Sequence, residues 1–162
     1  QRMLEFVSRS PEQTRRLGMR LGALLRGGDI VCLEGTLGSG KTCLAQGIGQ
    51  GWGVNQPIIS PTFIIIREYT RPQDRVRFCH IDLYRISDVE EALGLGLDEF
   101  LGDEYMVCVI EWAERVRPLI PDEHLWIRLD FADWTRRALH FTAQGERHMK
   151  LLLDFRRAAF GV

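Results

Sequence analysis

The apolar residues of this chain fall into short continuous runs and into longer segments with helical spacing, a combination that indicates an α/β protein. Two runs are apolar at every position, Ile-Val-Cys-Leu at 30–33 and Met-Val-Cys-Val-Ile at 106–110. Strands that are buried on both faces have this composition. We therefore expect two buried strands, the second of them in the centre of a sheet.

A helix is expected directly after Ser10, which is a good N-cap residue. Pro11 suits the first helical turn, and Gln13 completes a capping box with Ser10. Four leucines then form one apolar face, and Gly27-Gly28 is the expected end of the helix. These leucines are Leu17, Leu21, Leu24 and Leu25.

A second helix is expected from Thr42 to about Gln50, although glycines make its end intrinsically poor in helix propensity. Packing must therefore hold this helix. The glycines at and just after the end of this helix are Gly47, Gly49, Gly51 and Gly53. The remaining expected elements are an edge strand at 3–7, short helices at 88–93 and 98–101, a helical turn at 113–116 before Pro118, and a helix within 146–160.

Two pairs of strands are separated by links too short to contain a crossover helix. Strands at 63–69 and 76–83 are joined by a polar turn, and strands at 124–131 and 138–142 are joined by residues 132–137. Short links of this kind join antiparallel neighbours. We therefore expect antiparallel hairpins in an otherwise mainly parallel sheet, within a single domain that spans residues 1–162.

The charge balance argues against direct, strong binding to nucleic acid. The chain has 21 Lys and Arg against 22 Asp and Glu, a net charge of −1, and it is 45% apolar. An ordinary globular protein has this composition, whereas nucleic-acid-binding domains are usually basic. Its apolar runs are shorter than the roughly 20 residues of a membrane helix, and no signal peptide opens the sequence. We expect a cytoplasmic protein that does not contact a membrane.

The four cysteines are scattered and form no C-x-x-C pair. Three of them lie in apolar, strand-like runs, a position that suits reduced core thiols better than disulfides or zinc ligands. The four cysteines are Cys32, Cys43, Cys79 and Cys108.

Residues 35–42, which we name the glycine loop, read Gly-Thr-Leu-Gly-Ser-Gly-Lys-Thr and fit the phosphate-binding pattern G-x-x-x-x-G-K-[ST]. Its glycines, at 35, 38 and 40, let the backbone curl so that successive N–H groups converge on phosphate oxygens. Lys41 supplies a charge for the outer phosphates, and the Thr42 hydroxyl is placed to ligate Mg²⁺. A buried strand before the loop and a helix after it are the expected context, so the pattern predicts a nucleoside triphosphate site.

Glu111 follows the most apolar strand directly. In open α/β sheets ligands bind beyond the carboxyl ends of the strands, so we expect this carboxylate to approach Mg²⁺. The alternative is a solvated carboxylate at the end of a strand.

Asp82 also ends a strand, and His80, two residues earlier, shares its face. We interpret Asp82 as a second carboxylate near Mg²⁺ or the attacking water. His80 is either a residue that supports this site or a core residue, and the sequence leaves both open. Thr62, after Ser60-Pro61, is either a switch that senses the γ-phosphate or an ordinary turn hydroxyl.

Four blocks of the sequence together resemble the TsaE family of bacterial ATPases, small proteins required for threonylcarbamoyladenosine (t6A) modification of tRNA. The blocks are the glycine loop, Ser-Pro-Thr-Phe at 60–63, His-Ile-Asp-Leu-Tyr-Arg at 80–85 and Val-Ile-Glu-Trp at 109–112. The resemblance covers residues 10–139 and implies a P-loop NTPase-type three-layer sandwich with a mixed central sheet. The tail after Gly145 follows no pattern of the family.

The resemblance also implies roles for matching residues, with ATP and Mg²⁺ as cofactors. Thr42 and Glu111 would hold Mg²⁺, while Asp82, Lys41 and Thr62 would serve hydrolysis. The expected phosphate contacts are Gly35, Leu37, Gly38, Ser39, Gly40, Lys41, Thr42 and Cys43. The further nucleotide contacts are Gln13 and Thr14 near the adenine, Trp112 and Arg136.

What the resemblance implies about function is an accessory role. Hydrolysis of ATP would reset the complex that transfers threonylcarbamoyl to tRNA, in company with TsaD-like and TsaB-like subunits, and tRNA would be contacted only indirectly. No arginine finger is assignable, so we expect slow hydrolysis that a partner accelerates. Thr36 and Ser39 depart from the commoner residues of the family, at positions that phosphate geometry does not fix.

Two other functions use the same loop. A small-molecule kinase would need an acceptor pocket and a lid rich in arginine, for which Arg115 and Arg117 are the nearby candidates. A binding module without catalysis would use Mg-ATP only to set its conformation.

Overall fold

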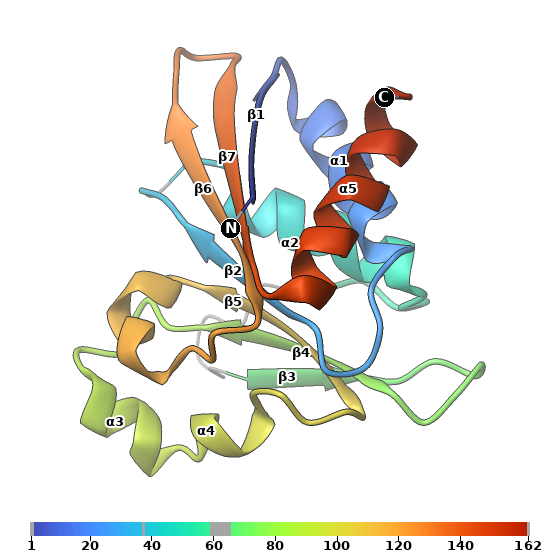
Figure 1. Cartoon of the computed structure of the whole chain (residues 1–162). Helices are drawn as coiled ribbons and strands as arrows, with labels where there is room; N and C mark the ends of the chain where they lie inside the picture. The colour runs from blue at the N-terminus through green and yellow to red at the C-terminus, as the bar shows by residue number, and fades with distance from the viewer. Residues whose placement is uncertain (1, 37, 59–65, 162) are drawn as a thin grey trace.

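A seven-stranded sheet forms the centre of the computed structural model within the residues that it describes, 2–36, 38–58 and 66–161 (Figure 1). The strand order is β1-β7-β6-β2-β5-β4-β3. The strands are β1 (Arg2–Ser8), β2 (Ile30–Glu34), β3 (Ile66–Tyr69), β4 (Arg77–Asp82), β5 (Met106–Glu111), β6 (His124–Phe131) and β7 (Arg137–Gln144).

The sheet is mixed, with a parallel centre. β2 pairs in parallel with β5 and β6, and β4 pairs in parallel with β5. Antiparallel pairs then extend both sides: β3 with β4, β6 with β7, and β7 with β1 at the edge. Both predicted hairpins and the predicted edge strand are confirmed, although residues 63–65 of the first hairpin lie outside the described ranges.

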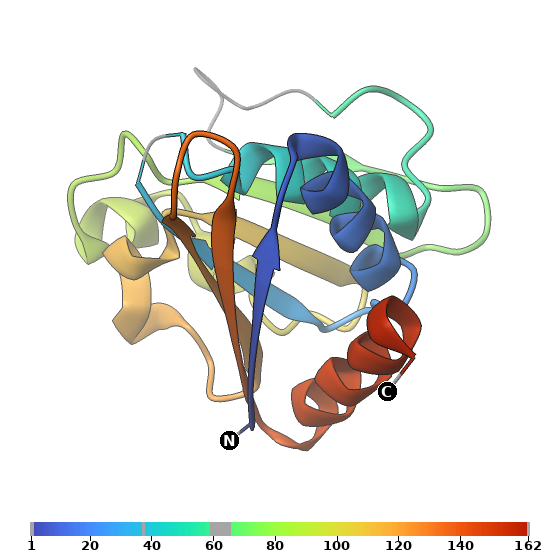
Figure 2. The same ribbon diagram turned by 90° about the horizontal axis from the view of Figure 1, so that it is seen from above.

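Helices cover both faces of the sheet and complete a three-layer sandwich (Figures 1 and 2). One face carries the longer helices, α1 (Pro11–Gly22), α2 (Lys41–Trp52) and α5 (Glu146–Phe160). The other carries the shorter α3 (Val89–Gly94), α4 (Leu97–Phe100) and the 3-10 helix η1 (Ala113–Leu119). The α/β sandwich that the sequence predicted is thus confirmed.

The apolar runs form the two buried layers because neighbouring side chains of a strand point to opposite faces. In β2, Val31 and Leu33 pack in the core under α1 and α2, whereas Ile30 and Cys32 pack in the core under η1. Every residue of β5 is buried. Both predicted buried strands are therefore confirmed, and the free thiols of Cys32, Cys79 and Cys108 lie in this interior.

The ends of two helices differ from the sequence predictions. α1 ends at Gly22 rather than at Gly27, because the chain tightens there into i to i−3 hydrogen bonds such as Leu24 N to Leu21 O at 3.0 Å. η1 extends to Leu119, past the predicted turn at 113–116, but Val116 has non-helical φ and ψ of −128° and 28°, so the chain kinks there and Pro118 follows the kink.

Glycines let α1 and α2 pack backbone against backbone. A Cβ atom at Gly22 would stand 1.9 Å from the carbonyl oxygen of Ile48, and one at Gly51 would stand 2.0 Å from that of Met19. No side chain fits at such distances. Packing, rather than propensity, thus holds the glycine-rich end of α2, as the sequence predicted.

A polar cluster built on the buried side chains of Asp29 and His148 ties α5 to the start of β2. The Arg147 guanidinium donates to both carboxylate oxygens of Asp29, at 3.0 and 2.7 Å. The backbone N–H of Ile30 donates to His148 Nε2 at 3.1 Å, and His148 Nδ1 lies 2.8 Å from a carboxylate oxygen of Glu123. The C-terminal helix is therefore joined to the strand that precedes the glycine loop.

Within the described residues, no helix combines the length and the apolar character needed to span a membrane.

Candidate active site

The glycine loop connects β2 to α2 at the carboxyl end of β2. Gly38 and Gly40 adopt left-handed backbone conformations, with φ of 79° and 102°, which residues with side chains rarely adopt. A Cβ at Gly35 would stand 2.6 Å from the carbonyl oxygen of Leu129, so this position also needs glycine. Leu37 lies outside the described residues.

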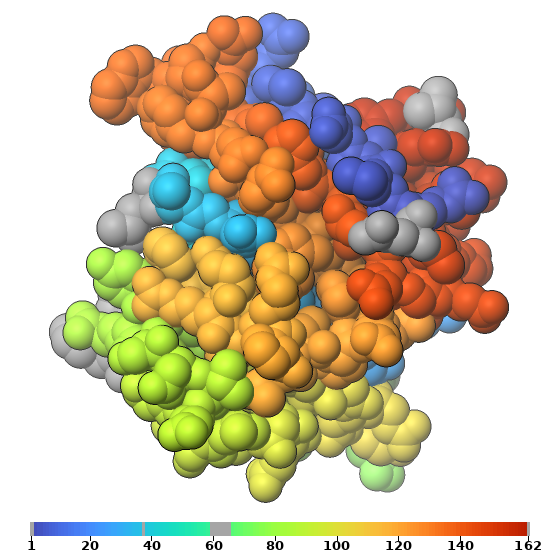
Figure 3. Space-filling view, turned by 60° about the vertical axis from the view of Figure 1, so that its left-hand side comes forward, coloured from blue at the N-terminus to red at the C-terminus, as the bar shows by residue number. Residues whose placement is uncertain are grey.

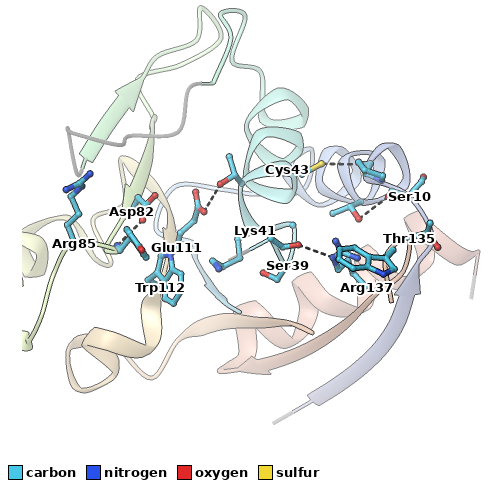
Figure 4. A pocket seen from close by; sticks show the side chains of 17 residues that line it. Ser10, Ser39, Lys41, Cys43, Asp82, Arg85, Glu111, Trp112, Thr135 and Arg137 are labelled. Atoms are coloured by element: carbon cyan, nitrogen blue, oxygen red, sulfur yellow. Dashed lines mark hydrogen bonds between the residues drawn. The ribbon is translucent and has the colours of Figure 1, made fainter. Parts of the chain in front are cut away.

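A cavity of about 510 Å³ opens beside the glycine loop (Figure 4). Its walls come from the loop, from the start of α1, from the carboxyl ends of β4 and β5, and from the turn between β6 and β7. Among the predicted site residues, those that line it are Thr14, Gly38, Ser39, Gly40, Lys41, Thr42, Cys43, Asp82, Glu111 and Trp112. The structure thus brings together residues that are far apart in the sequence.

Glu111 is held by two neighbours at the end of β5. The Thr42 hydroxyl donates to Glu111 Oε1 at 3.0 Å, and His80 Nε2 lies 2.6 Å from Glu111 Oε2. A carboxylate only accepts hydrogen bonds, so His80 is the donor. Glu111 is 2% exposed and His80 is fully buried, so Glu111 is not a solvated carboxylate. His80 is both a core residue and a support of the site.

Asp82 pairs in register with Glu111 across β4 and β5, and both carboxylates line the cavity. Its Oδ1 accepts a hydrogen bond from the backbone N–H of Tyr84 at 2.9 Å. Burial raises the pKa of Asp82, and the negative charge of Glu111 raises it further. Asp82 is therefore more basic than an ordinary aspartate, which suits a residue that takes a hydrogen bond from water.

Lys41 lies under the glycine loop and is 5% exposed. Its ammonium group donates to the carbonyl oxygens of Gly35 and of Thr36, the second at 3.0 Å. It also lies 4.1 Å from the ring centroid of Trp112, whose backbone is left-handed with φ of 62°. Burial lowers the pKa of Lys41, and the nearby Glu111 opposes that shift.

The oxygens at this end of the cavity fit Mg²⁺ held jointly with phosphate. Thr42 Oγ1 and Glu111 Oε1 converge, and both are the hard ligands that Mg²⁺ takes in proteins. Within the described residues, no group of three or more His, Cys, Asp or Glu side chains gathers to hold a metal by itself. Mg²⁺ is commonly bound by one or two protein ligands together with substrate phosphates, which matches this set.

Gln13 and Arg136 do not line the cavity. The Gln13 side chain accepts from the backbone N–H of Arg9 at 2.7 Å, near the start of α1. Arg136 pairs instead with Asp133 at 2.6 Å. Their predicted contacts with a nucleotide stay predictions, and Thr62 lies outside the described residues.

Three cavity residues at the turn between β6 and β7 were missed from the sequence: Trp134, Thr135 and Arg137, the first residue of β7. Arg137 Nε donates to the carbonyl oxygen of Gly38 at 3.1 Å, so Arg137 rather than Arg136 reaches the glycine loop. Trp134 and Thr135 line the cavity as well. The signal was available only in part, because a turn of uncertain length does not tell which of two successive arginines faces the loop.

The glycine loop lies between a parallel strand and a helix, and the mixed sheet is the middle layer of a three-layer sandwich. These features define a P-loop-type α/β protein. The chain belongs to the TsaE family: the model described as "Threonylcarbamoyl adenosine biosynthesis protein TsaE" matches residues 8–139. This match confirms the resemblance seen in the four sequence blocks and places the protein in t6A biosynthesis.

Named relatives support the same assignment. The tRNA threonylcarbamoyladenosine biosynthesis protein TsaE of Bacillus subtilis (strain 168) is 35% identical over 156 residues, which cover 96% of both chains. The TsaE protein of Streptomyces coelicolor is 41% identical over 136 residues, which cover 83% of this chain and 86% of the relative. A crystal structure of YdiB from Bacillus subtilis matches with a TM-score of 0.79 at 32% identity, covering 96% of this chain and 95% of that one.

Proposed function

We propose that this protein binds and hydrolyses ATP with Mg²⁺ and thereby drives turnover of the complex that attaches threonylcarbamoyl to tRNA, without performing the transfer itself. One observation carries the proposal. The Thr42 hydroxyl meets the Glu111 carboxylate at 3.0 Å, in the cavity that also contains Lys41 and Asp82. These are the groups that hold, neutralise and hydrolyse a triphosphate in P-loop proteins.

Each of these residues has a separate role in the proposal. Lys41 binds the outer phosphates, and Thr42 with Glu111 would hold Mg²⁺, which neutralises the phosphate oxygens when bound. Asp82 orients the attacking water and accepts a hydrogen bond from it. His80 keeps Glu111 in position through the 2.6 Å contact. Thr62 remains a predicted sensor of the γ-phosphate.

The partners proposed for this chain are TsaD-like and TsaB-like subunits of the transferase complex, with tRNA contacted only through them. Membership in a t6A family supports partners from that machinery. The net charge of −1 supports indirect rather than direct contact with tRNA. We propose a cytoplasmic location, where tRNA is modified.

The deciding experiment is reconstituted tRNA modification with both partners, followed over many cycles. Lys41→Ala is expected to support no more than the first cycle, because the outer phosphates lose their cation. Lys150→Ala is the matched control, since Lys150 lies on α5 with 63% of its side chain exposed. Equal yields over many cycles from wild type and Lys41→Ala would refute the proposal.

The isolated chain is expected to hydrolyse ATP slowly and to be accelerated by its partners. Steady-state phosphate release, measured with and without the partner subunits, tests this expectation. Fast turnover by the chain alone would contradict it.

The kinase alternative lacks support from its lid candidates. Arg115 donates to the carbonyl oxygens of Tyr84 and Ile86, and Arg117 stacks on the Trp126 ring at 4.0 Å. Both arginines are therefore engaged in the fold rather than held over an acceptor. Phosphate release that begins only after a metabolite is added, with phosphorylation of that metabolite, would restore the kinase function.

A further inference from the structure

The cavity has two chemically different ends, separated by the glycine loop (Figure 4). One end contains the carboxylates of Asp82 and Glu111. The other lies between the start of α1 and the β6–β7 turn, where Ser10, Thr135 and Arg137 are found. In the proposed function the outer phosphates face the carboxylates, so the nucleoside extends toward the second end.

The β6–β7 turn is held firmly at this second end. Asp133 Oδ1 accepts from the backbone N–H groups of Thr135 and Arg136, at 2.9 and 2.8 Å. Arg137 donates to the carbonyl oxygens of Asp133, at 2.8 Å, and of Gly38, at 3.1 Å. The turn is therefore fixed to the glycine loop, although it projects from the surface as the orange segment above the cyan one in Figure 3.

Trp134 is carried on this fixed turn and is 89% exposed. Its ring meets that of Phe131 nearly at right angles, with 5.6 Å between centroids. Such an edge-to-face contact orients a ring while leaving much of its surface uncovered. A large aromatic face is thus presented where a nucleoside would lie.

The hydroxyl groups at this end are already engaged within the protein. Ser10 Oγ accepts from the backbone N–H of Gln13 at 3.1 Å. The Thr14 hydroxyl contacts the carbonyl oxygen of Ser10 at 3.2 Å and the hydroxyl of Ser8 at 2.6 Å. The second end therefore has a stacking surface but few side-chain groups to read the edge of a base.

We propose that Trp134 stacks on the base of the bound nucleotide and is the principal base contact of this site. The inference rests on the proposed function, because it requires a nucleotide in the cavity. Stacking accepts any base, since every base has a π face. Loss of the ring should therefore weaken adenine and guanine nucleotides by similar factors.

The test compares ADP with inorganic pyrophosphate, which shares the phosphates and lacks the nucleoside. Isothermal titration calorimetry with Mg²⁺ would be applied to the wild type, Trp134→Ala, Trp134→Phe and the control Tyr105→Ala. Tyr105 is 50% exposed and does not line the cavity. Trp134→Ala is expected to bind ADP and GDP about tenfold more weakly, the scale of one lost stacking contact. Its affinity for pyrophosphate should stay within about twofold of the wild type.

Trp134→Phe should retain most of the affinity for ADP, and Tyr105→Ala should retain all of it. Unchanged ADP binding by Trp134→Ala overturns the inference while leaving the proposed function intact. Equal weakening of ADP and pyrophosphate also overturns it, because the turn would then act only on the glycine loop. A wild-type protein that binds no nucleotide removes the proposed function itself.

Discussion

His80 Nε2 lies 2.6 Å from Glu111 Oε2 in the protein interior, and the two residues belong to the neighbouring strands β4 and β5. This contact leaves Glu111 Oε1 directed at Thr42. His80→Ala should therefore weaken Mg²⁺-dependent nucleotide binding by about 10- to 100-fold, the usual effect of removing the group that orients a metal ligand. Calorimetry with ADP in Mg²⁺ and in EDTA measures it.

Binding of metal-free ADP should hardly change in His80→Ala. The control is His140→Ala, because His140 lies on β7 and contacts Glu5 and Asp130 rather than the cavity. An equal loss of affinity with and without Mg²⁺ would show that His80 only supports the core.

Asp82→Asn should separate hydrolysis from binding. Asparagine preserves an acceptor for the Tyr84 N–H but presents an NH₂ donor in place of the second carboxylate oxygen, so it accepts no hydrogen bond from the attacking water there, and hydrolysis should fall about 100-fold or more. ATP affinity should be kept or improved, because one carboxylate facing the phosphates is gone. Phosphate release and calorimetry test the two parts. Sustained cycling of tRNA modification despite lost hydrolysis would instead favour a pure binding switch.

The raised pKa of Asp82 adds a pH dependence. As the pH falls through this pKa the carboxylate is protonated, so wild-type hydrolysis should fall toward acid pH before an ordinary aspartate would titrate.

The raised pKa of Asp82 also affects stability. Because the folded protein disfavours the ionised carboxylate, the free energy of unfolding is lower above that pKa than below it. Asp82→Asn should therefore raise the melting temperature near neutral pH, and a lower melting temperature would contradict the assigned cause.

Gly22→Ala tests the close contact between α1 and α2. The added methyl group would stand 1.9 Å from the Ile48 carbonyl oxygen, so the helices must separate, at a cost of about 2–3 kcal/mol in the free energy of unfolding. Gly94→Ala is the matched control in α3, where a Cβ meets nothing within 4 Å. That change should stabilise by about 0.5 kcal/mol through helix propensity. The free energy of unfolding of both variants, measured in urea, tests this prediction. An equal loss of stability in the two variants would refute the packing argument.

His148 should make stability depend on pH. Burial lowers the pKa of His148 below its ordinary 6.5, and its Nε2 accepts the Ile30 N–H, so protonation breaks that bond. Asp29 and Glu123 oppose this shift, while Arg147 adds to it. Because the unfolded chain takes up the proton first, stability is complete above pH 6.5 and declines as the pH falls toward the folded-state pKa.

The measurement for His148 is urea unfolding between pH 7.5 and 5. His148→Gln should lower stability at pH 7.5 and flatten the acid decline, by at most about 1.4 kcal/mol per pH unit. An unchanged slope would assign the acid sensitivity to other groups.

Local features of this fold were predictable from sequence, whereas contacts that depend on strand order were not. The cap at Ser10, the short hairpin links and the glycine loop all specify their own conformation within a few residues. The contact of His80 with Glu111 instead requires β4 to lie beside β5, which no local pattern states.

The same reason explains the missed residues at the β6–β7 turn. Whether Arg136 or Arg137 faces the glycine loop depends on a single step of the strand alternation, which the Asp133 turn sets. The contact between Asp29 and Arg147 joins positions 118 apart in the sequence, so it too escaped prediction.

The partners of β2 determine when, during synthesis, the glycine loop acquires its supporting structure. The strand that carries the glycine loop pairs with β5 and β6, and the N–H of its first residue is bonded to His148. All three partners leave the ribosome after the loop does. The loop therefore emerges before the strands that pair with β2 and before its anchor on α5, so a chain truncated before α5 should lack a finished site.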